Sequence, residues 1–318
     1  MGKSLKEDIK NARKCENLND PIDNYVLDYV AIVFSRLFIK LRIIPNVITV
    51  LSGLVGVAGG ILLCFNSMLT TILGIIMIIL SVVFDECDGQ VARLTKKYSS
   101  FGRTLDGFVD FLVYLSIYIA LCVRLYPVNI PFTETPWKLW IIPVAAITLW
   151  CFGAQARTLD YFKNLHMYMV KNGGGKQNEL TKTEEIKRQL YACKRFSFSR
   201  LRLSLYYSYT KLQEKSTPNS QKLLKKIEES GNEIPQSLSD AYKAKSTKYI
   251  MLANTLAFNL RTIVLFILLL LPWHLEFFYF PFVVFILEPV RIAVIKKYER
   301  LATDISNQYF SKQTETDK

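Results

Sequence analysis

The sequence predicts an all-α integral membrane protein. We expect a bundle of six membrane helices, an amphipathic helix at the membrane surface before them, and a cytoplasmic helical insertion within them. Hydrophobic residues make up 51% of the 318-residue chain. Many of them gather in runs of about 20, the length at which a helix crosses a bilayer. A long polar stretch after the fourth run separates it from the last two.

The apolar runs predict membrane helices at residues 45–66, 68–86, 104–124, 138–160, 248–272 and 276–296. We expect five segments: a cytoplasmic N-terminus (1–44), membrane helices one to four (45–162), a cytoplasmic insertion (163–247), helices five and six (248–298), and a cytoplasmic tail (299–318). Within the insertion, the pattern predicts helices at 183–212 and 221–230, the second ended by Gly231. The tail after Arg300 reads as disordered.

Lysines and arginines concentrate in alternate connections between the spans. They include Lys96, Lys97, Lys187, Arg188, Lys296 and Lys297. Since basic loops stay on the cytoplasmic side, both termini and the insertion are expected there. The formal charge of +13 is explained by anionic lipid headgroups, so no nucleic-acid partner is expected.

Residues 24–42 form an amphipathic pattern. One side carries apolar residues, namely Val26, Tyr29, Val30, Val33, Leu37 and Leu41, with Arg36 and Lys40 elsewhere. The pattern predicts an interfacial helix; the alternative is a short core helix. In the insertion, Arg195, Arg200 and Arg202 are candidates for headgroup contact or for covering the active-site mouth, with a solvated face as the default interpretation.

Four aspartates follow one another at short intervals: Asp85, Asp88, Asp106 and Asp110. On helices, residues three or four apart share a face, so two carboxylate pairs can face each other. Clustered carboxylates repel unless they are neutralised, and hard oxygen ligands suit Mg²⁺, Mn²⁺ or Ca²⁺. The spacing therefore predicts a divalent metal site.

The residues around the aspartates indicate a diphosphate ligand. Gly89 and Gly102 leave room for a bulky group, and Arg93 supplies a cation. The only two histidines, His166 and His274, have no Ser or Cys partner pattern nearby, which argues against a catalytic triad.

Residues 85–110, in the pattern Asp-x2-Asp-Gly-x2-Ala-Arg-x8-Gly-x3-Asp-x3-Asp, resemble the complete signature of the CDP-alcohol phosphotransferase family. Residues 45–49 resemble the stretch that opens the first membrane helix of that family, and the likeness covers about residues 24–162 well. It implies transfer of a substituted phosphoryl group from a CDP-linked donor to an alcohol, with release of CMP.

Carried over by position, the resemblance implies two metal ions, Mg²⁺ or Mn²⁺, on the four aspartates, with Asp110 also the general base. The implied CDP-donor site comprises Asn46, Thr49, Gly89, Ala92, Arg93 and Gly102. Family members are commonly homodimers, and the glycines at 53, 56, 59 and 60 allow close contact within the bundle or between subunits. The whole chain loosely resembles bacterial inositol-lipid synthases such as phosphatidylinositol-phosphate synthase, which implies a CDP-diacylglycerol donor and a bacterial inner membrane.

Three arginines in or near the spans, Arg157, Arg261 and Arg291, would be costly facing lipid and are expected to face inward. If they converge beside the aspartates, the small polar acceptor is anionic, and inositol phosphate is the first choice. Glycerol phosphate, serine and amino-alcohols remain alternatives. Arg291 has another interpretation, in which it snorkels to the interface and pairs with Glu288.

A different class of function is a transporter whose aspartates bind a permeating cation. Such a protein needs a polar path across the bilayer, whereas spans two and three are apolar from their rims outward. The pattern therefore favours the enzyme.

Overall fold

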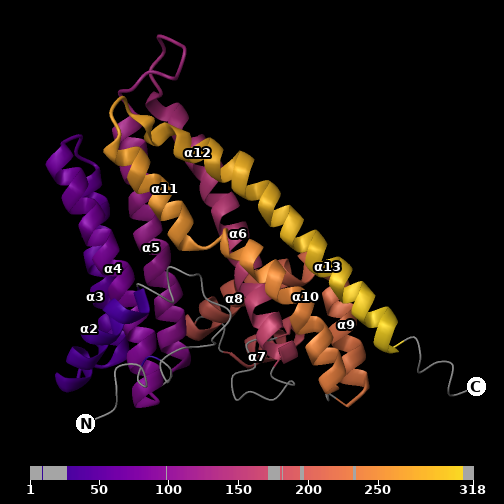
Figure 1. Ribbon diagram of the computed structural model, residues 1–318. Helices are drawn as coiled ribbons and strands as arrows, with labels where there is room; N and C mark the ends of the chain where they lie inside the picture. Colours follow the sequence, from indigo (N-terminus) through magenta and orange to yellow (C-terminus); the bar gives the residue numbers. More distant parts are fainter. Residues whose placement is uncertain are drawn as a thin grey trace, which may run out of the picture. The chain divides into compact units, whose positions relative to one another are not determined.

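The chain is helical through most of the residues that the computed structural model describes. These are residues 27–97, 99–170, 182–193, 197–231 and 234–310, together with Ile9 and Leu180. Figure 1 shows the helices in sequence order. Within these ranges there is no strand, only a single bridge between Asn129 and Pro136. Six helical segments are long and apolar enough to cross a membrane, and this confirms the all-α membrane fold.

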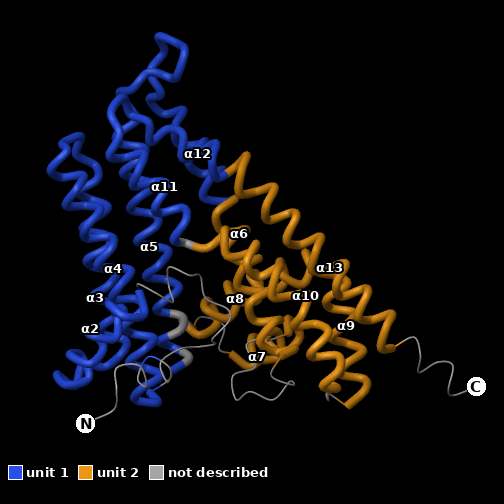
Figure 2. Tube along the Cα trace, in the orientation of Figure 1, with its two compact units in different colours: residues 1–150, 258–283 blue, residues 151–257, 284–318 orange. Residues whose placement is uncertain are grey.

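The chain forms two compact units, coloured separately in Figure 2. Unit 1 comprises Met1–Trp150 and Phe258–Val283, and unit 2 comprises Cys151–Ala257 and Val284–Lys318. The elements of unit 1 are α2 (Asp28–Lys40), α3 (Pro45–Leu63), α4 (Met68–Thr95), α5 (Ser100–Leu125), η2 (Lys138–Trp140), α11 (Phe258–Leu270), η3 (Leu275–Phe278) and α12 (Tyr279–Pro281). The long helix α6 (Ile141–Val170) begins in unit 1 and continues into unit 2.

Local chemistry sets the ends of the helices around the aspartates. Pro45 occupies the first turn of α3, where its missing N–H costs nothing. Helix α4 ends at Thr95, and its C-cap Lys96 adopts the left-handed conformation (φ 56°). Helix α5 starts at Ser99, whose Oγ accepts a hydrogen bond of 2.8 Å from the Gly102 N–H.

The glycines of α3 pack against neighbouring helices inside unit 1. A Cβ added at Gly59 would lie 2.9 Å from the carbonyl oxygen of Gly74 on α4. A Cβ at Gly60 would lie 2.2 Å from Ser116 Oγ on α5, and one at Gly53 2.7 Å from a Val109 methyl. The small residues therefore serve close contacts among α3, α4 and α5.

Helix α2 has two faces. Ala31, Ile32 and Phe38 are buried with their side chains toward the core, and Ser35 Oγ donates to Gln90 Oε1 of α4 (3.1 Å). The opposite face exposes the predicted apolar stripe, represented by Tyr29, Val30, Val33, Leu37 and Leu41. Residues 24–26 of the predicted segment, Val26 included, lie outside the described residues. Such an exposed stripe on a packed helix fits the interfacial prediction.

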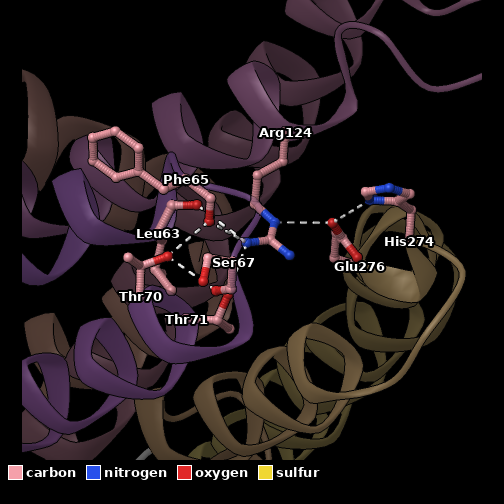
Figure 3. A network of polar contacts seen from close by, with 8 residues as sticks. All are labelled: Leu63, Phe65, Ser67, Thr70, Thr71, Arg124, His274 and Glu276. Atoms are coloured by element: carbon pink, nitrogen blue, oxygen red, sulfur yellow. Dashed lines mark hydrogen bonds and ion pairs between the residues drawn. The ribbon is translucent and has the colours of Figure 1, made fainter.

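A buried ion pair ties several elements of unit 1 together (Figure 3). Arg124 of α5 donates from Nε to Glu276 Oε1 of η3 at 3.0 Å. Its Nη1 donates to Thr71 Oγ1 (3.0 Å) and to the carbonyl oxygens of Leu63 and Phe65 (both 3.3 Å). His274 Nδ1 lies 3.2 Å from the same Glu276 oxygen. This cluster, which no pattern in the sequence predicted, satisfies carbonyl groups at the end of α3 that no helix bond covers.

The fifth predicted span, 248–272, falls almost entirely within a candidate membrane span, but its helix is interrupted. Helix α10 (Gln236–Asn254) ends in a tight turn, and α11 begins at Phe258. In the turn, the N–H groups of Thr255, Leu256 and Ala257 each bond to the carbonyl three residues earlier. Asn and Thr compete for backbone hydrogen bonds, which favours such a break.

Unit 2 contains the insertion, the end of α6 and the whole of the last helix. Its further elements are α7 (Thr183–Ala192), α8 (Phe198–Ser216), α9 (Pro218–Glu229), α10 and α13 (Glu288–Phe310), with a π-helical segment (Phe282–Leu287) leading into α13. Phe162 of α6 stacks on Tyr298 of α13 with 4.1 Å between ring centroids. His166 Nδ1 lies 2.9 Å from Ser246 Oγ of α10. The predicted helices at 183–212 and 221–230 are confirmed, with a break at Cys193, and Gly231 (φ 91°) follows α9 as expected.

The predicted disorder after Arg300 is wrong for residues 301–310, because α13 continues to Phe310. Leu301, Ala302 and Ile305 recur at helical spacing and are buried, and α13 packs against α9 and α10. Helices of the insertion cover the apolar face of these turns. The sequence of the tail alone does not predict this contact. Residues 311–318 lie outside the described residues.

Candidate active site

Three of the four aspartates meet between α4 and α5. Asp85 and Asp88 lie on α4, and Asp106 lies on α5. One carboxylate oxygen of each lies within 4.8 Å of the other two. Two helices therefore bring three acidic side chains into one cluster, the arrangement required of a divalent cation site.

Asp110 lies one helical turn beyond Asp106 on α5 and is not in this group of three. Its side chain is exposed, whereas Asp88 is buried and Asp85 and Asp106 are half-buried. Because residues four apart share a helix face, Asp110 continues the acidic face of α5 toward its exposed side.

Helix α3 orients the buried member of the cluster. Thr49 Oγ1 donates a hydrogen bond to Asp88 Oδ2. One turn further along, Ser81 Oγ of α4 donates to the Ser52 carbonyl oxygen of α3 at 2.8 Å. These bonds fix the register of α3 on α4, and with it the direction of the Asp88 carboxylate.

The residues present fit a hard divalent cation. Asp85 Oδ1 is buried and has no hydrogen-bond partner among the described residues. A buried carboxylate oxygen in that state is costly unless a cation satisfies it. Carboxylate-only ligands suit Mg²⁺ and Mn²⁺ better than softer metals.

Arg93 lies over Gly89 on α4. A Cβ added at Gly89 would be 3.0 Å from an Arg93 guanidinium nitrogen, so the glycine leaves the space that this side chain occupies. Arg93 Nη2 donates to Glu86 Oε1 at 2.9 Å, two turns earlier on the same helix. Its Nε is buried and has no hydrogen-bond partner among the described residues. Glu86 therefore fixes the guanidinium, and its Nε can still donate a hydrogen bond to a ligand.

Gly102 permits a close approach of α5 to the start of α3. A Cβ added there would lie 2.7 Å from Asn46 Oδ1 and 2.8 Å from Ser99 Oγ. The space next to Gly102 is thus shared with Asn46, one of the predicted donor-site residues. Ala92, another of them, is half-buried on α4.

The three predicted acceptor arginines divide between the two units. Arg261 of α11 lies in unit 1 and is 2% exposed, with Tyr114, Tyr118 and Tyr279 as electrostatic neighbours. Tyr114 is also an electrostatic neighbour of Asp110, which precedes it by one turn on α5. A buried cation and the exposed aspartate therefore have a tyrosine neighbour in common.

Arg157 and Arg291 lie in unit 2 and line one cleft between α6, α8 and α13. The cleft has about 310 Å³ of open space, counting the solvent at its mouth. Gln213, Ser216 and Thr217 contribute polar side chains to it. Arg291 Nε donates to Glu288 Oε1 at 2.7 Å, so the pairing that the sequence offered as the alternative interpretation is present. The convergence of all three arginines beside the aspartates stays a prediction.

Two residues at the site were not anticipated from the sequence. Glu86 accepts a hydrogen bond from Arg93. The sequence feature that could have indicated this is an acidic residue seven positions before Arg93, on the same helical face. Ser99 caps α5. The sequence feature that could have indicated this is a serine directly before the predicted helix that carries Asp106. Neither occupies a fixed position of the motif, so neither stood out in it.

Comparison with known families agrees with this geometry. Residues 42–170 match the family model described as CDP-alcohol phosphatidyltransferase. No curated protein matches the chain. The matched segment contains the aspartate cluster, the positions predicted for the donor site and the start of α3. Members of the family transfer a phosphatidyl group from a CDP-linked donor to an alcohol acceptor. Residues 42–170 of the chain thus form a CDP-alcohol phosphatidyltransferase domain.

Proposed function

We propose that the protein transfers the phosphatidyl group of CDP-diacylglycerol to the hydroxyl of an anionic polyol, with inositol phosphate as first choice, and releases CMP. The observation that carries this proposal is the meeting of the Asp85, Asp88 and Asp106 carboxylates within 4.8 Å in a chain of this family.

We assign Asp85, Asp88, Asp106 and Asp110 to two divalent ions, Mg²⁺ or Mn²⁺. When bound, such ions neutralise the diphosphate of the donor and the charge that develops on departing CMP. The buried Asp85 Oδ1, which lacks a hydrogen-bond partner among the described residues, supports this assignment. Thr49 keeps Asp88 oriented for the same task.

We assign Asp110 as the general base. Its exposure on the acidic face of α5 supports the role, because the acceptor arrives from water. Asp110 takes the proton from the acceptor hydroxyl. The hydroxyl oxygen forms the new bond to phosphorus, and the bond from phosphorus to the CMP oxygen breaks. No covalent intermediate on the protein is needed, since positioning and charge neutralisation suffice.

The remaining motif residues hold the donor. Arg93, kept in place by Glu86 and with its Nε free to donate, contacts a phosphate oxygen. Gly89 and Gly102 leave room along the two helix backbones. Asn46, Thr49 and Ala92 complete the CDP site.

An anionic acceptor is proposed on the strength of the arginines. Arg261 is buried close to the tyrosine that neighbours Asp110, and a buried cation in a membrane protein marks a ligand path more often than a lipid contact. Arg157 and Arg291 line a polar cleft in unit 2. A phosphorylated polyol suits such cations better than serine or an amino-alcohol.

The proposed setting is a bacterial inner membrane, with the aspartates and both termini on the cytoplasmic side and a homodimer as the working assembly. The basic residues after α4, in the insertion and along α13 support this orientation. Residues 45–162 carry the chemistry in this proposal, flanked by the N-terminal segment 1–44, the insertion 163–247, the last membrane helices 248–298 and the tail 299–318.

Release of CMP tests the proposal directly. Purified protein is incubated with CDP-diacylglycerol, Mg²⁺ or Mn²⁺, and in turn inositol phosphate, glycerol phosphate, serine or an amino-alcohol. We expect CMP release that EDTA abolishes, and product mass identifies the acceptor. Asp110→Asn should remove most of it, whereas Asp304→Asn, the same change at an exposed position of α13, should not. No release with any acceptor, or undiminished release from Asp110→Asn, contradicts the assignment.

A further inference from the structure

Helix α8 of the insertion exposes a row of leucines. Leu201, Leu205 and Leu212 are 59%, 66% and 41% exposed. At about 100° per residue, these three positions fall within roughly 40° of one another. The opposite side of the helix holds Leu203 and Thr210, which are buried. Unit 2 thus buries one face of α8 and leaves an apolar stripe uncovered.

Basic residues border this leucine stripe on both sides. Arg200 and Lys211 lie on one flank and Arg202 on the other, about 60–100° from the nearest leucine of the stripe. Glu214 is the single acidic residue of α8. Its Oε1 accepts a hydrogen bond of 2.8 Å from the Thr183 N–H at the start of α7, so it faces the interior of unit 2. The exposed side of α8 is therefore apolar in the middle and cationic at its edges.

Hydrogen bonds attach α8 to a specific turn of α6. Tyr209 OH donates to Asp160 Oδ2 at 3.0 Å, and Gln213 Nε2 donates to the Arg157 carbonyl oxygen at 3.2 Å. Burial and the neighbouring Asp160 carboxylate raise the pKa of the Tyr209 phenol, so it stays protonated and remains a donor at neutral pH.

That turn of α6 lies at the expected edge of the bilayer. Asp160 comes about 20 residues after Ile141, where α6 begins, and 20 helical residues span about 30 Å, the thickness of the hydrocarbon core. The apolar run of α6 also gives way to charged residues at Arg157 and Asp160. A helix fastened there lies at headgroup depth rather than in bulk water.

We propose that α8 is a membrane-surface helix that binds the anionic headgroups of the same membrane that anchors the chain. Leu201, Leu205 and Leu212 enter the boundary between headgroups and acyl chains, and Arg200, Arg202 and Lys211 contact lipid phosphates. An apolar stripe edged by cations matches an anionic bilayer in charge and in polarity. A soluble acidic protein would match the cations but not the stripe. The proposal does not depend on the reaction at the aspartate cluster.

Photocrosslinking in nanodiscs tests this. The full-length protein carries a benzophenone amino acid in place of Leu205, or of Leu201 as a second site, in discs of phosphatidylcholine with 30% phosphatidylglycerol. The control places it at Lys225 of α9, where 76% of the side chain is exposed. We expect lipid adducts, measured by mass, to be about fivefold more abundant at Leu205 than at Lys225. Arg200→Gln together with Arg202→Gln should lower the Leu205 adduct about twofold, as should pure phosphatidylcholine.

Two outcomes overturn the proposal. One is a lipid yield at Leu205 and Leu201 no higher than at Lys225, which means a solvated face. The other is a crosslink from Leu205 to a second protein chain, which means that the stripe is a contact between copies. Because the readout is a lipid adduct and not CMP release, failure here is distinct from failure of the proposed enzyme activity.

Discussion

Thr49 on α3 donates a hydrogen bond to the Asp88 carboxylate on α4. The hydroxyl thus orients a proposed metal ligand, as outer-shell hydrogen bonds do in known metal sites. It also explains why residues near the start of α3 belong to the same site as a motif that begins 36 positions later in the chain.

Replacing Thr49 by Val removes this hydrogen bond while keeping the shape of the side chain. A hydrogen bond to a charged group contributes about 1.5–3 kcal/mol, so the Mg²⁺ concentration for half-maximal CMP release should rise about 10- to 100-fold. Thr49→Ser keeps a hydroxyl and should stay close to the unmodified protein. Equal Mg²⁺ midpoints for Thr49→Val and Thr49→Ser would show that the bond does not support the site.

Arg124 and Glu276 form a buried ion pair in unit 1, with side chains 7% and 1% exposed (Figure 3). Arg124→Leu leaves Glu276 as a buried charge without its cation, and loss of one partner of such a pair costs about 3–5 kcal/mol. Unfolding by SDS in mixed micelles, followed by circular dichroism, should show this loss. The double variant Arg124→Leu with Glu276→Leu removes both charges.

The double variant should be more stable than the sum of the single losses predicts, because no buried charge is stranded. A double variant whose loss equals that sum would show that Arg124 acts on the α3 carbonyl oxygens and Thr71 rather than on Glu276. Such a result would mean that Arg124 and Glu276 contribute independently to the stability of unit 1.

Much of the fold follows from local pattern. The helices that begin at Pro45 and Met68 fall where apolar runs start, and Gly231 ends α9 as its backbone freedom suggests. The break after Asn254 and the helix beyond Arg300 were not predicted. The break has only a weak local signal in Asn254 and Thr255. The helix beyond Arg300 depends on partners distant in sequence, because the last turns of α13 are covered by insertion helices that composition alone does not place.

The candidate site was predictable to the extent that it rests on helical spacing. Residues three and four apart placed the aspartates on shared faces, and three of them meet in space. Packing, including that of the α3 glycines, decides which faces of α4 and α5 turn toward each other. Spacing along the sequence does not predict this packing. Glu86 occupies a variable position of the motif, so its hydrogen bond with Arg93 could not be predicted from the motif.

Gly60→Ala should destabilise unit 1. The added methyl would meet Ser116 Oγ at 2.2 Å and Ser116 Cβ at 2.7 Å, so α3 and α5 would have to separate. Overpacking of this kind costs about 1–3 kcal/mol. Gly107→Ala is the matched control, because nothing lies within 4 Å of its Cβ position and alanine favours helix by up to about 1 kcal/mol. SDS unfolding of both variants gives the comparison, and equal stability would contradict the close packing.

Glu299 of α13 caps α9 from 80 residues away: its carboxylate accepts hydrogen bonds from the N–H groups of Asn219 (2.6 Å) and Ser220 (3.1 Å) and from Ser220 Oγ (2.6 Å). Glu299→Ala leaves the first turn of α9 without this cap, which costs about 0.5–2 kcal/mol. Hydrogen exchange of the full-length protein should then speed up across α9 about 2- to 30-fold, because local opening becomes easier. Glu229→Ala, an exposed acid at the far end of α9, should leave exchange in the first turn unchanged. Unchanged exchange in Glu299→Ala would mean that Leu223 and Ile227, buried under α13, dock the insertion without the cap.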